Sequence, residues 1–234
     1  MAALAGRIAL ITGASRGIGA AVARRFAAEG AHVVLAARTV GGLEEVDDAI
    51  QSGGGSATLV PLDLRESAQI DQLGAALYSR YGKLDILVGN AAVLGMLAPL
   101  GHIDIPAWDE VMAVNVTANW RLIRSMDPLL RLSEAGRAIF VTAAQGSGLF
   151  PYWGAYAASK AALEMMVRTY AGEMGMTKVR VNLIDPGVAR TALRAQAFPG
   201  ENPAELPRPD EVAPAFVPLA AADCTRHGEL VRCG

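Results

Sequence analysis

The chain has 234 residues, which is enough for one large α/β domain with a buried core. Hydrophobic residues make up 52% and charged residues 19%, with a formal net charge of -2, so the composition excludes a disordered chain and a basic nucleic-acid footprint. No apolar run reaches the roughly eighteen residues of a membrane span, and residues 1–7 lack a secretory signal pattern. We therefore expect a cytoplasmic protein without nucleic-acid or membrane partners, in which Cys224 and Cys233 stay reduced.

The N-terminal segment alternates strand, glycine turn, helix and strand. Residues 8–11 form an apolar run that suits a buried parallel strand, and residues 12–19 are rich in glycine. A helical pattern follows and stops at Gly30, and residues 32–37 predict a second strand. This order is typical of the opening of a dinucleotide-binding unit, in which glycines let phosphates approach the amides at the helix start. A tight turn without a ligand is the alternative.

The alternation continues to the C-terminus. The patterns predict helices at about 41–52, 67–81, 106–132, 156–174 and 210–222, and strands at 57–62, 84–88, 137–142, 179–184 and 229–231. Residues 1–234 should therefore form a single-domain α/β fold, a doubly wound (Rossmann) parallel sheet of about seven strands with helices on both faces. Residues 188–214 contain recurrent prolines. Because too little chain follows to form another domain, we expect this segment to cover the substrate.

Tyr156 and Lys160 are four residues apart in a predicted helix, so both side chains project from one face. A phenol has an ordinary pKa of about 10, and a nearby cation favours the phenolate. A tyrosine adjusted in this way can exchange a proton with a substrate oxygen. The pair can also occur by chance in a helix of this composition, so it indicates a catalytic site only if the rest of the chain supports one.

Thr12, Gly13, Gly17 and Gly19 have the spacing Thr-Gly-x-x-x-Gly-x-Gly. Together with the Tyr-x-x-x-Lys pair, this motif resembles the short-chain dehydrogenase/reductase family over nearly the whole chain. The resemblance implies an NAD(P)-dependent oxidoreductase that moves a hydride between nicotinamide and a carbonyl or alcohol substrate. Tyr156 would be the acid/base, and Lys160 would lower its pKa. The cofactor-binding residues implied are Gly13, Ser15, Arg16, Gly17, Ile18, Gly19, Arg38, Asp63, Leu64, Asn90, Ala91, Tyr156, Lys160, Pro186, Gly187, Val188 and Thr191.

The residues after the second predicted strand favour NADP(H) over NAD(H). Ala37 stands where an acidic residue would bind the ribose 2′-hydroxyl of NAD, and Arg38 follows it. A cation there can accept the additional 2′-phosphate, and Arg16 supplies a second positive charge. The alternative is that both arginines are solvated surface residues.

Three further residues match the family pattern, each with a structural alternative. Asp63 would contact the adenine or cap the next helix. Asn90 stands in Asn-Ala-Ala where the family has Asn-Ala-Gly, and could instead hold the strand ends together. The resemblance implies that Asn115 kinks its helix, is part of the catalytic set and links a water to Lys160. A buried asparagine also needs hydrogen-bond partners for structural reasons alone.

The pattern breaks at Ala143. The family places there, thirteen residues before the tyrosine, a serine that hydrogen-bonds the substrate carbonyl. Thr142 is adjacent but should point to the opposite face, and Ser147 lies in the following loop. The substrate pocket should be lined by Ala143, Ser147, Tyr152 and Trp153, and its aromatic side chains favour an apolar or aromatic substrate. A cofactor-binding protein with weak or no turnover is therefore the alternative function.

Apolar stripes on the predicted helices at 116–132 and 156–174 predict an association surface, although burial in the core would also explain them. The resemblance implies that these helices form the subunit interface of a homodimer or homotetramer. Nothing in the sequence predicts a metal site.

Overall fold

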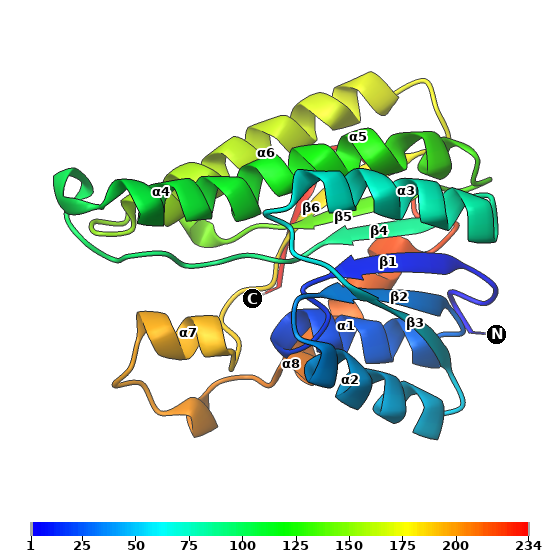
Figure 1. Ribbon diagram of the computed structural model, residues 1–234, viewed down its shortest axis with the longest axis horizontal. Helices are drawn as coiled ribbons and strands as arrows, with labels where there is room; N and C mark the ends of the chain where they lie inside the picture. The colour runs from blue at the N-terminus through cyan, green and yellow to red at the C-terminus, as the bar shows by residue number, and fades with distance from the viewer. Residues whose placement is uncertain (1, 234) are drawn as a thin grey trace.

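The structure is a computed structural model that describes residues 2–233. Its centre is one parallel sheet of seven strands in the order β3-β2-β1-β4-β5-β6-β7 (Figure 1). The strands are β1 Ile8–Thr12, β2 His32–Ala37, β3 Ser56–Pro61, β4 Ile86–Gly89, β5 Arg137–Val141, β6 Arg180–Asp185 and β7 Leu230–Arg232. The predicted doubly wound parallel sheet of about seven strands is confirmed.

Helices cover both faces of the sheet. They are α1 Gly17–Ala28, α2 Val40–Ser52, α3 Ser67–Tyr81, α4 Ile105–Met112, α5 Ala118–Arg131, α6 Gly154–Met174, α7 Ala192–Ala197, α8 Pro209–Val212 and α9 Val217–Ala220. Figure 1 shows α3, α4, α5 and α6 on one side of the sheet and α1, α2 and α8 on the other, with α7 set apart at one end. No helix of residues 2–233 is long and apolar enough to cross a bilayer.

The central strands are buried because both of their faces meet helices. Successive side chains of β1 enter different cores: Leu10 packs in the cluster that contains residues of α3, α5 and α6, whereas Ile11 packs in the cluster that contains residues of α1. This covering of both faces explains why the strands read as continuous apolar runs in the sequence.

Two predicted helices are interrupted. The helix expected at 106–132 changes at Ala113–Thr117 into a π-helical turn, which contains Asn115 and joins α4 to α5. The helix expected at 210–222 is divided into α8, a 3-10 turn at Ala213–Phe216 and α9. Pro214 and Pro218 explain the second interruption, since proline cannot donate the backbone hydrogen bond that continues a helix.

The amino ends of the strands carry a buried polar network. Asp85 precedes β4, is buried, and accepts hydrogen bonds from Ile8 N at 3.0 Å, from Lys83 Nζ at 2.9 Å and from Ser133 Oγ. Burial alone would raise the pKa of the Asp85 carboxyl, but these three hydrogen bonds hold it below its usual value. The network ties β1, β4 and the segment after α5 together at this edge of the sheet.

Candidate active site

The cavity with the sequence-predicted residues lies at the carboxyl ends of the strands, where ligands bind in open parallel sheets. Its volume is about 480 Å³. The predicted site residues that line it are Gly13, Ser15, Arg16, Gly17, Ile18, Arg38, Asp63, Leu64, Asn90, Ala91, Ala143, Trp153, Tyr156, Lys160, Pro186, Gly187, Val188 and Thr191. Four predicted residues, Gly19, Asn115, Ser147 and Tyr152, are not part of the lining.

The glycine turn before α1 forms one wall of the cavity. Gly13 and Gly17 have left-handed φ angles of 66° and 58°, which glycine adopts without strain. α1 begins at Gly17, and no side chain caps its first turn. The free amides and the positive end of the helix dipole therefore suit an anion such as a phosphate. A Cβ at Gly19 would lie 2.3 Å from the Gly13 oxygen, so Gly19 is required for packing inside the turn.

Asn90 connects the ends of two neighbouring strands beside this turn. Its Nδ2 donates to the Thr12 oxygen at 2.8 Å, and its backbone N–H donates to Thr12 Oγ1 at 3.0 Å. Ala91 N donates to the same hydroxyl at 3.2 Å. The structural role considered for Asn90 is therefore present, and the residue also lines the cavity.

Arg16 and Arg38 supply positive charge where β1 and β2 end. Within residues 2–233, neither guanidinium has a carboxylate within 4.0 Å. Asp63 is nearby but pairs with Arg65 at 2.6 Å, and this hydrogen bond holds the pKa of the Asp63 carboxyl below its usual value. The two arginines are therefore available to a phosphate group.

Tyr156 and Lys160 both lie in the cavity wall and are 6% and 3% exposed. Lys160 Nζ lies 5.6 Å from the centroid of the Tyr156 ring and donates to the Val141 oxygen at 2.9 Å. Burial lowers the pKa of Lys160 to about 8, although the Asp185 and Glu164 carboxylates act in the opposite direction. The ammonium is therefore mostly protonated at pH 7.

Burial, with a smaller effect of Asp185, raises the pKa of the Tyr156 phenol above its ordinary value. The predicted lowering of this pKa by Lys160 is therefore not observed in the chain by itself. Desolvation disfavours the charged phenolate, and the Asp185 carboxylate disfavours it further. At neutral pH the buried tyrosine is a protonated acid.

Asn115 is fully buried in the π-helical turn. Its Oδ1 accepts from Val93 N at 2.9 Å, and its Nδ2 donates to the Val93 oxygen and to Ser159 Oγ, both at 3.0 Å. Ser159 Oγ in turn donates to the backbone carbonyl oxygen of Tyr156 at 2.7 Å. The asparagine side chain therefore joins the loop after β4 to the helix of Tyr156, and it has no free amide hydrogen for a water.

The end of β5 differs from the family pattern in its side chains. Ala143 lines the cavity with a methyl group, and Thr142 Oγ1 donates to Glu164 Oε1 at 2.8 Å. Ser147 is exposed outside the lining, so neither hydroxyl considered in the sequence is directed freely at the site. Tyr152 is also exposed and has a left-handed φ of 71°.

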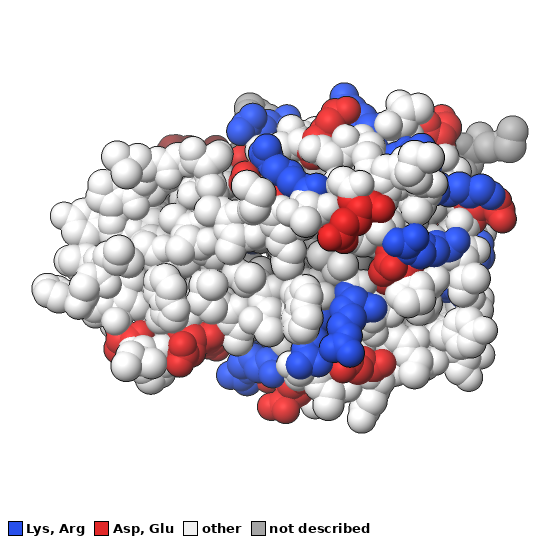
Figure 2. Space-filling view, turned by 90° about the horizontal axis from the view of Figure 1, so that it is seen from above, with Lys and Arg blue, Asp and Glu red and all other residues white. Residues whose placement is uncertain are grey.

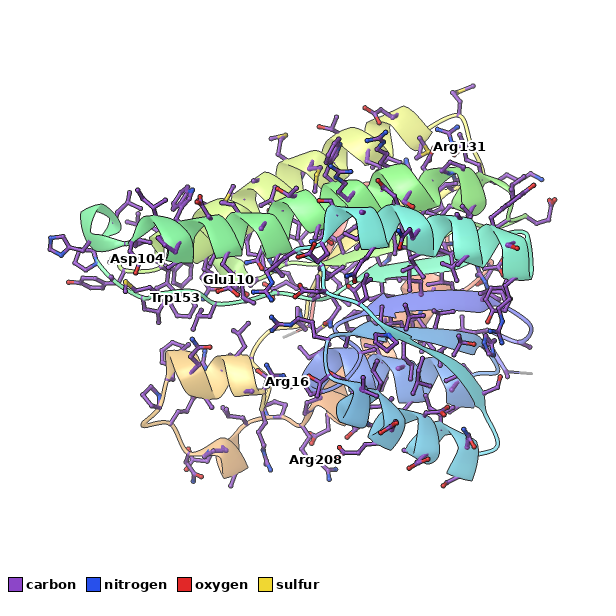
Figure 3. The ribbon with its side chains drawn as sticks, viewed as in Figure 1. Arg16, Asp104, Glu110, Arg131, Trp153 and Arg208 are labelled. Atoms are coloured by element: carbon purple, nitrogen blue, oxygen red, sulfur yellow. The ribbon has the colours of Figure 1, made fainter. Side chains whose placement is uncertain are left out.

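The segment after β6 covers one side of the cavity with α7. The Trp153 ring lies 5.8 Å from the ring centroids of both Tyr156 and Phe198, so it connects α6 to the end of α7. Arg194 pairs with Glu201 at 2.6 Å and stacks 3.8 Å from the Phe198 centroid. Figure 3 shows Trp153 on the side of the upper helices that faces α7, and Arg16 beside the start of α1.

Sequence reasoning missed several cavity-lining residues. Among them are Val93 and Gln145, which follow β4 and β5, and three residues of α7: Leu193, Arg194 and Ala197. The position of Gln145, two residues after Ala143, was the available signal. The α7 residues lie within the segment predicted to cover the substrate, but a proline-rich pattern does not identify which side chains face inward.

The fold and the cavity together define a nucleotide-dependent oxidoreductase architecture, in which a glycine turn and a buried tyrosine–lysine pair share one cavity. Residues 7–202 match the family model described as short chain dehydrogenase. The chain is 39% identical over 223 residues to the uncharacterized oxidoreductase YciK of Escherichia coli strain K12, covering 94% of this chain and 88% of that protein.

Solved structures agree with this match. A chain from Pseudomonas syringae, described as a short chain dehydrogenase, superposes with a TM-score of 0.96 at 40% identity, over 99% of this chain and 96% of that one. A short chain dehydrogenase structure from Escherichia coli CFT073, complexed with NADPH, superposes with a TM-score of 0.95 at 37% identity, over 99% and 98%. The protein belongs to the short chain dehydrogenase family.

Proposed function

We propose that the protein is an NADP(H)-dependent oxidoreductase that interconverts a carbonyl compound and an alcohol. The observation that supports this most is the buried Tyr156–Lys160 pair, which lines the same cavity as the glycine turn before α1. One ligand in this cavity can therefore contact both the phosphate-binding turn and the proton donor.

NADP(H) fits the residues that are present. The free amides at the start of α1 suit a pyrophosphate. Arg16 and Arg38, which have no carboxylate within 4.0 Å among residues 2–233, suit the 2′-phosphate. The related structure crystallised with NADPH supports the same choice. When bound, NADPH supplies the hydride that a carbonyl carbon accepts.

Tyr156 then donates its phenolic proton to the substrate oxygen, which becomes the hydroxyl of the product. A raised pKa keeps the phenol protonated at neutral pH, which suits reduction. Lys160 uses one N–H on the Val141 oxygen, so two of its three donors are available to the cofactor ribose and the tyrosine. Because both amide hydrogens of Asn115 are used, a water that links it to Lys160 would have to bind the Asn115 backbone oxygen. This oxygen already accepts a hydrogen bond from Asn119 Nδ2 at 2.9 Å, and its second lone pair can accept one from the water.

The test is NADPH oxidation by purified protein against a panel of ketones and aldehydes, with Tyr156→Phe beside the wild type. We expect the variant to lose about 10²–10⁴-fold in turnover while NADPH affinity stays within a few-fold, because only the proton donor is removed. Tyr152→Phe is the matched control, since Tyr152 is exposed and outside the cavity lining. Equal turnover by Tyr156→Phe and the wild type would refute the assignment.

A second candidate is a cofactor-binding protein with weak or no turnover. It is favoured by the methyl group of Ala143 and by the Thr142 hydroxyl, which is committed to Glu164. NADPH binding without oxidation by any compound of the panel would support this function.

We also propose that residues 1–234 act as one domain and that two or four copies assemble with two-fold symmetry. Trp120 on α5 and Met165 on α6 are 46% and 66% exposed, so both of the helices expected at the interface present apolar side chains to solvent. Figure 2 looks down on the upper helices and shows few charged side chains at the end where α4 lies. The mass in solution tests the assembly, and cell fractionation tests the expected cytoplasmic location.

A further inference from the structure

We propose that Gln145 donates the hydrogen bond to the substrate oxygen that the family's serine would donate from position 143. This inference rests on the proposed function, because it assigns a second group to the same reaction. Gln145 lies in the 3-10 turn Ala144–Gly146, directly after the end of β5, and lines the cavity together with Ala143, Tyr156 and Lys160.

The neighbouring side chains do not offer this donor. Ala143 has only a methyl group, and Thr142 is 2% exposed with its hydroxyl donating to Glu164 Oε1. Ser147 does not line the cavity. Gln145 does line the cavity. Its side-chain N–H groups have no hydrogen-bond partner among residues 2–233, so they are available to a ligand.

The turn that carries Gln145 is held close to the helix of the tyrosine. A Cβ at Gly146 would lie 2.5 Å from Glu164 Oε1 and 3.2 Å from the Lys160 carbonyl carbon, so this glycine allows the turn to contact α6 directly. Gly146 N also donates to the Ala143 oxygen at 2.9 Å. The contact with Glu164 and Lys160 therefore fixes the backbone on which Gln145 is mounted.

An amide N–H has the chemistry that this position needs. Its hydrogen bond to the substrate oxygen strengthens as negative charge develops there, and the glutamine keeps its proton throughout. Tyr156 remains the group whose proton is transferred. The glutamine side chain is longer than serine, which compensates for its position two residues further along the chain.

The experiment compares the wild type with Gln145→Leu, Ala143→Ser and the double variant, using NADPH and one ketone accepted in the panel. We expect Gln145→Leu to lower kcat about 10²–10³-fold with little change in KM, because the lost bond strengthens in the transition state. Ala143→Ser should restore most of this loss in the Gln145→Leu background and change the wild type by less than about tenfold. Gln72→Leu is the matched control, since Gln72 is exposed on α3 and does not line the cavity.

Infrared spectroscopy gives a readout that does not require turnover. In the complex with NADP⁺, which cannot reduce a ketone, the carbonyl stretch of bound ¹³C-labelled acetophenone should lie at lower frequency in the wild type than in Gln145→Leu. NADPH affinity and the thermal midpoint should be alike in all variants, so a general folding defect is distinguishable from a lost donor.

Two results would overturn the inference. One is an unchanged kcat and an unchanged carbonyl frequency in Gln145→Leu while Tyr156→Phe is inactive, which leaves the proposed function intact. The other is a gain of about 10²-fold or more from Ala143→Ser in the wild-type background, because a position already served by Gln145 would not gain so much. If no variant oxidises NADPH, the proposed reduction fails and the infrared comparison still decides whether Gln145 contacts the carbonyl.

Discussion

Cofactor choice gives the sharpest prediction, and the perturbation is Arg38→Ala. The Arg38 guanidinium lines the cavity and has no carboxylate partner within residues 2–233, so its donors are available to the 2′-phosphate of NADPH. NADH has a hydroxyl in the same place. The substitution should therefore weaken NADPH binding and leave NADH binding nearly unchanged.

The magnitude follows from the loss of one charge-assisted hydrogen-bonding group. Such a bond contributes about 1.5–3 kcal/mol, which corresponds to a rise in the NADPH dissociation constant of about 10- to 150-fold. Arg38→Asp places a carboxylate that repels the 2′-phosphate of NADPH and can accept a hydrogen bond from the 2′-hydroxyl of NADH. The preference of this variant for NADPH over NADH should therefore be smaller still, or reversed.

The assay is titration of each cofactor by isothermal calorimetry. Arg80→Ala is the matched control, because Arg80 is an exposed arginine of α3 whose removal changes the net charge equally. Added salt should also weaken NADPH binding more than NADH binding in the wild type. Equal affinities of the wild type for NADPH and NADH, or an Arg38→Ala variant within threefold of the wild type for NADPH, would refute the reasoning.

Three other properties can be measured on the same protein. The rate of reduction should decline as the pH rises through about 8, where Lys160 loses its proton. The free energy of unfolding should rise between about pH 8 and pH 10, because the lysine of the unfolded chain keeps its proton there. The Lys160→Met variant should lack that rise, and a rise of the same size in the variant would contradict the assignment. Asp85→Asn should lower the free energy of unfolding at pH 7 by about 1–3 kcal/mol in urea titrations, because it weakens a buried hydrogen-bond network. The depressed pKa of Asp85 stabilises the fold above the unfolded value of about 4, so this difference should shrink as the pH falls through and below that value, and equal stability at pH 7 would count against the network. Light scattering should give a dimer or tetramer for the wild type and a smaller mass when Trp120 and Met165 are both changed to Glu, whereas a monomeric wild type at micromolar concentration would remove the proposed assembly.

The order of strands and helices could be predicted because it depends on local patterns. Buried parallel strands appear in the sequence as short apolar runs. Glycines appear in the turn at residues 12–19 because its backbone adopts left-handed φ angles that other residues rarely adopt. The spacing of Tyr156 and Lys160 likewise follows from the helical period alone. The sequence by itself therefore determined the fold and the placement of Tyr156 and Lys160 on one face of a helix.

Tertiary structure decided the electrostatics and the direction of individual side chains. Burial raises the pKa of Tyr156, and Asp185 adds to this effect. Both effects depend on how segments distant in the sequence pack around the tyrosine, so the spacing of residues in the helix could not predict them. The hydrogen bond from Thr142 to Glu164 joins residues 22 positions apart, whereas the Gln145 side chain, which also follows β5, has no hydrogen-bond partner among residues 2–233. Such contacts form only when distant segments pack together, so only the folded chain could reveal them.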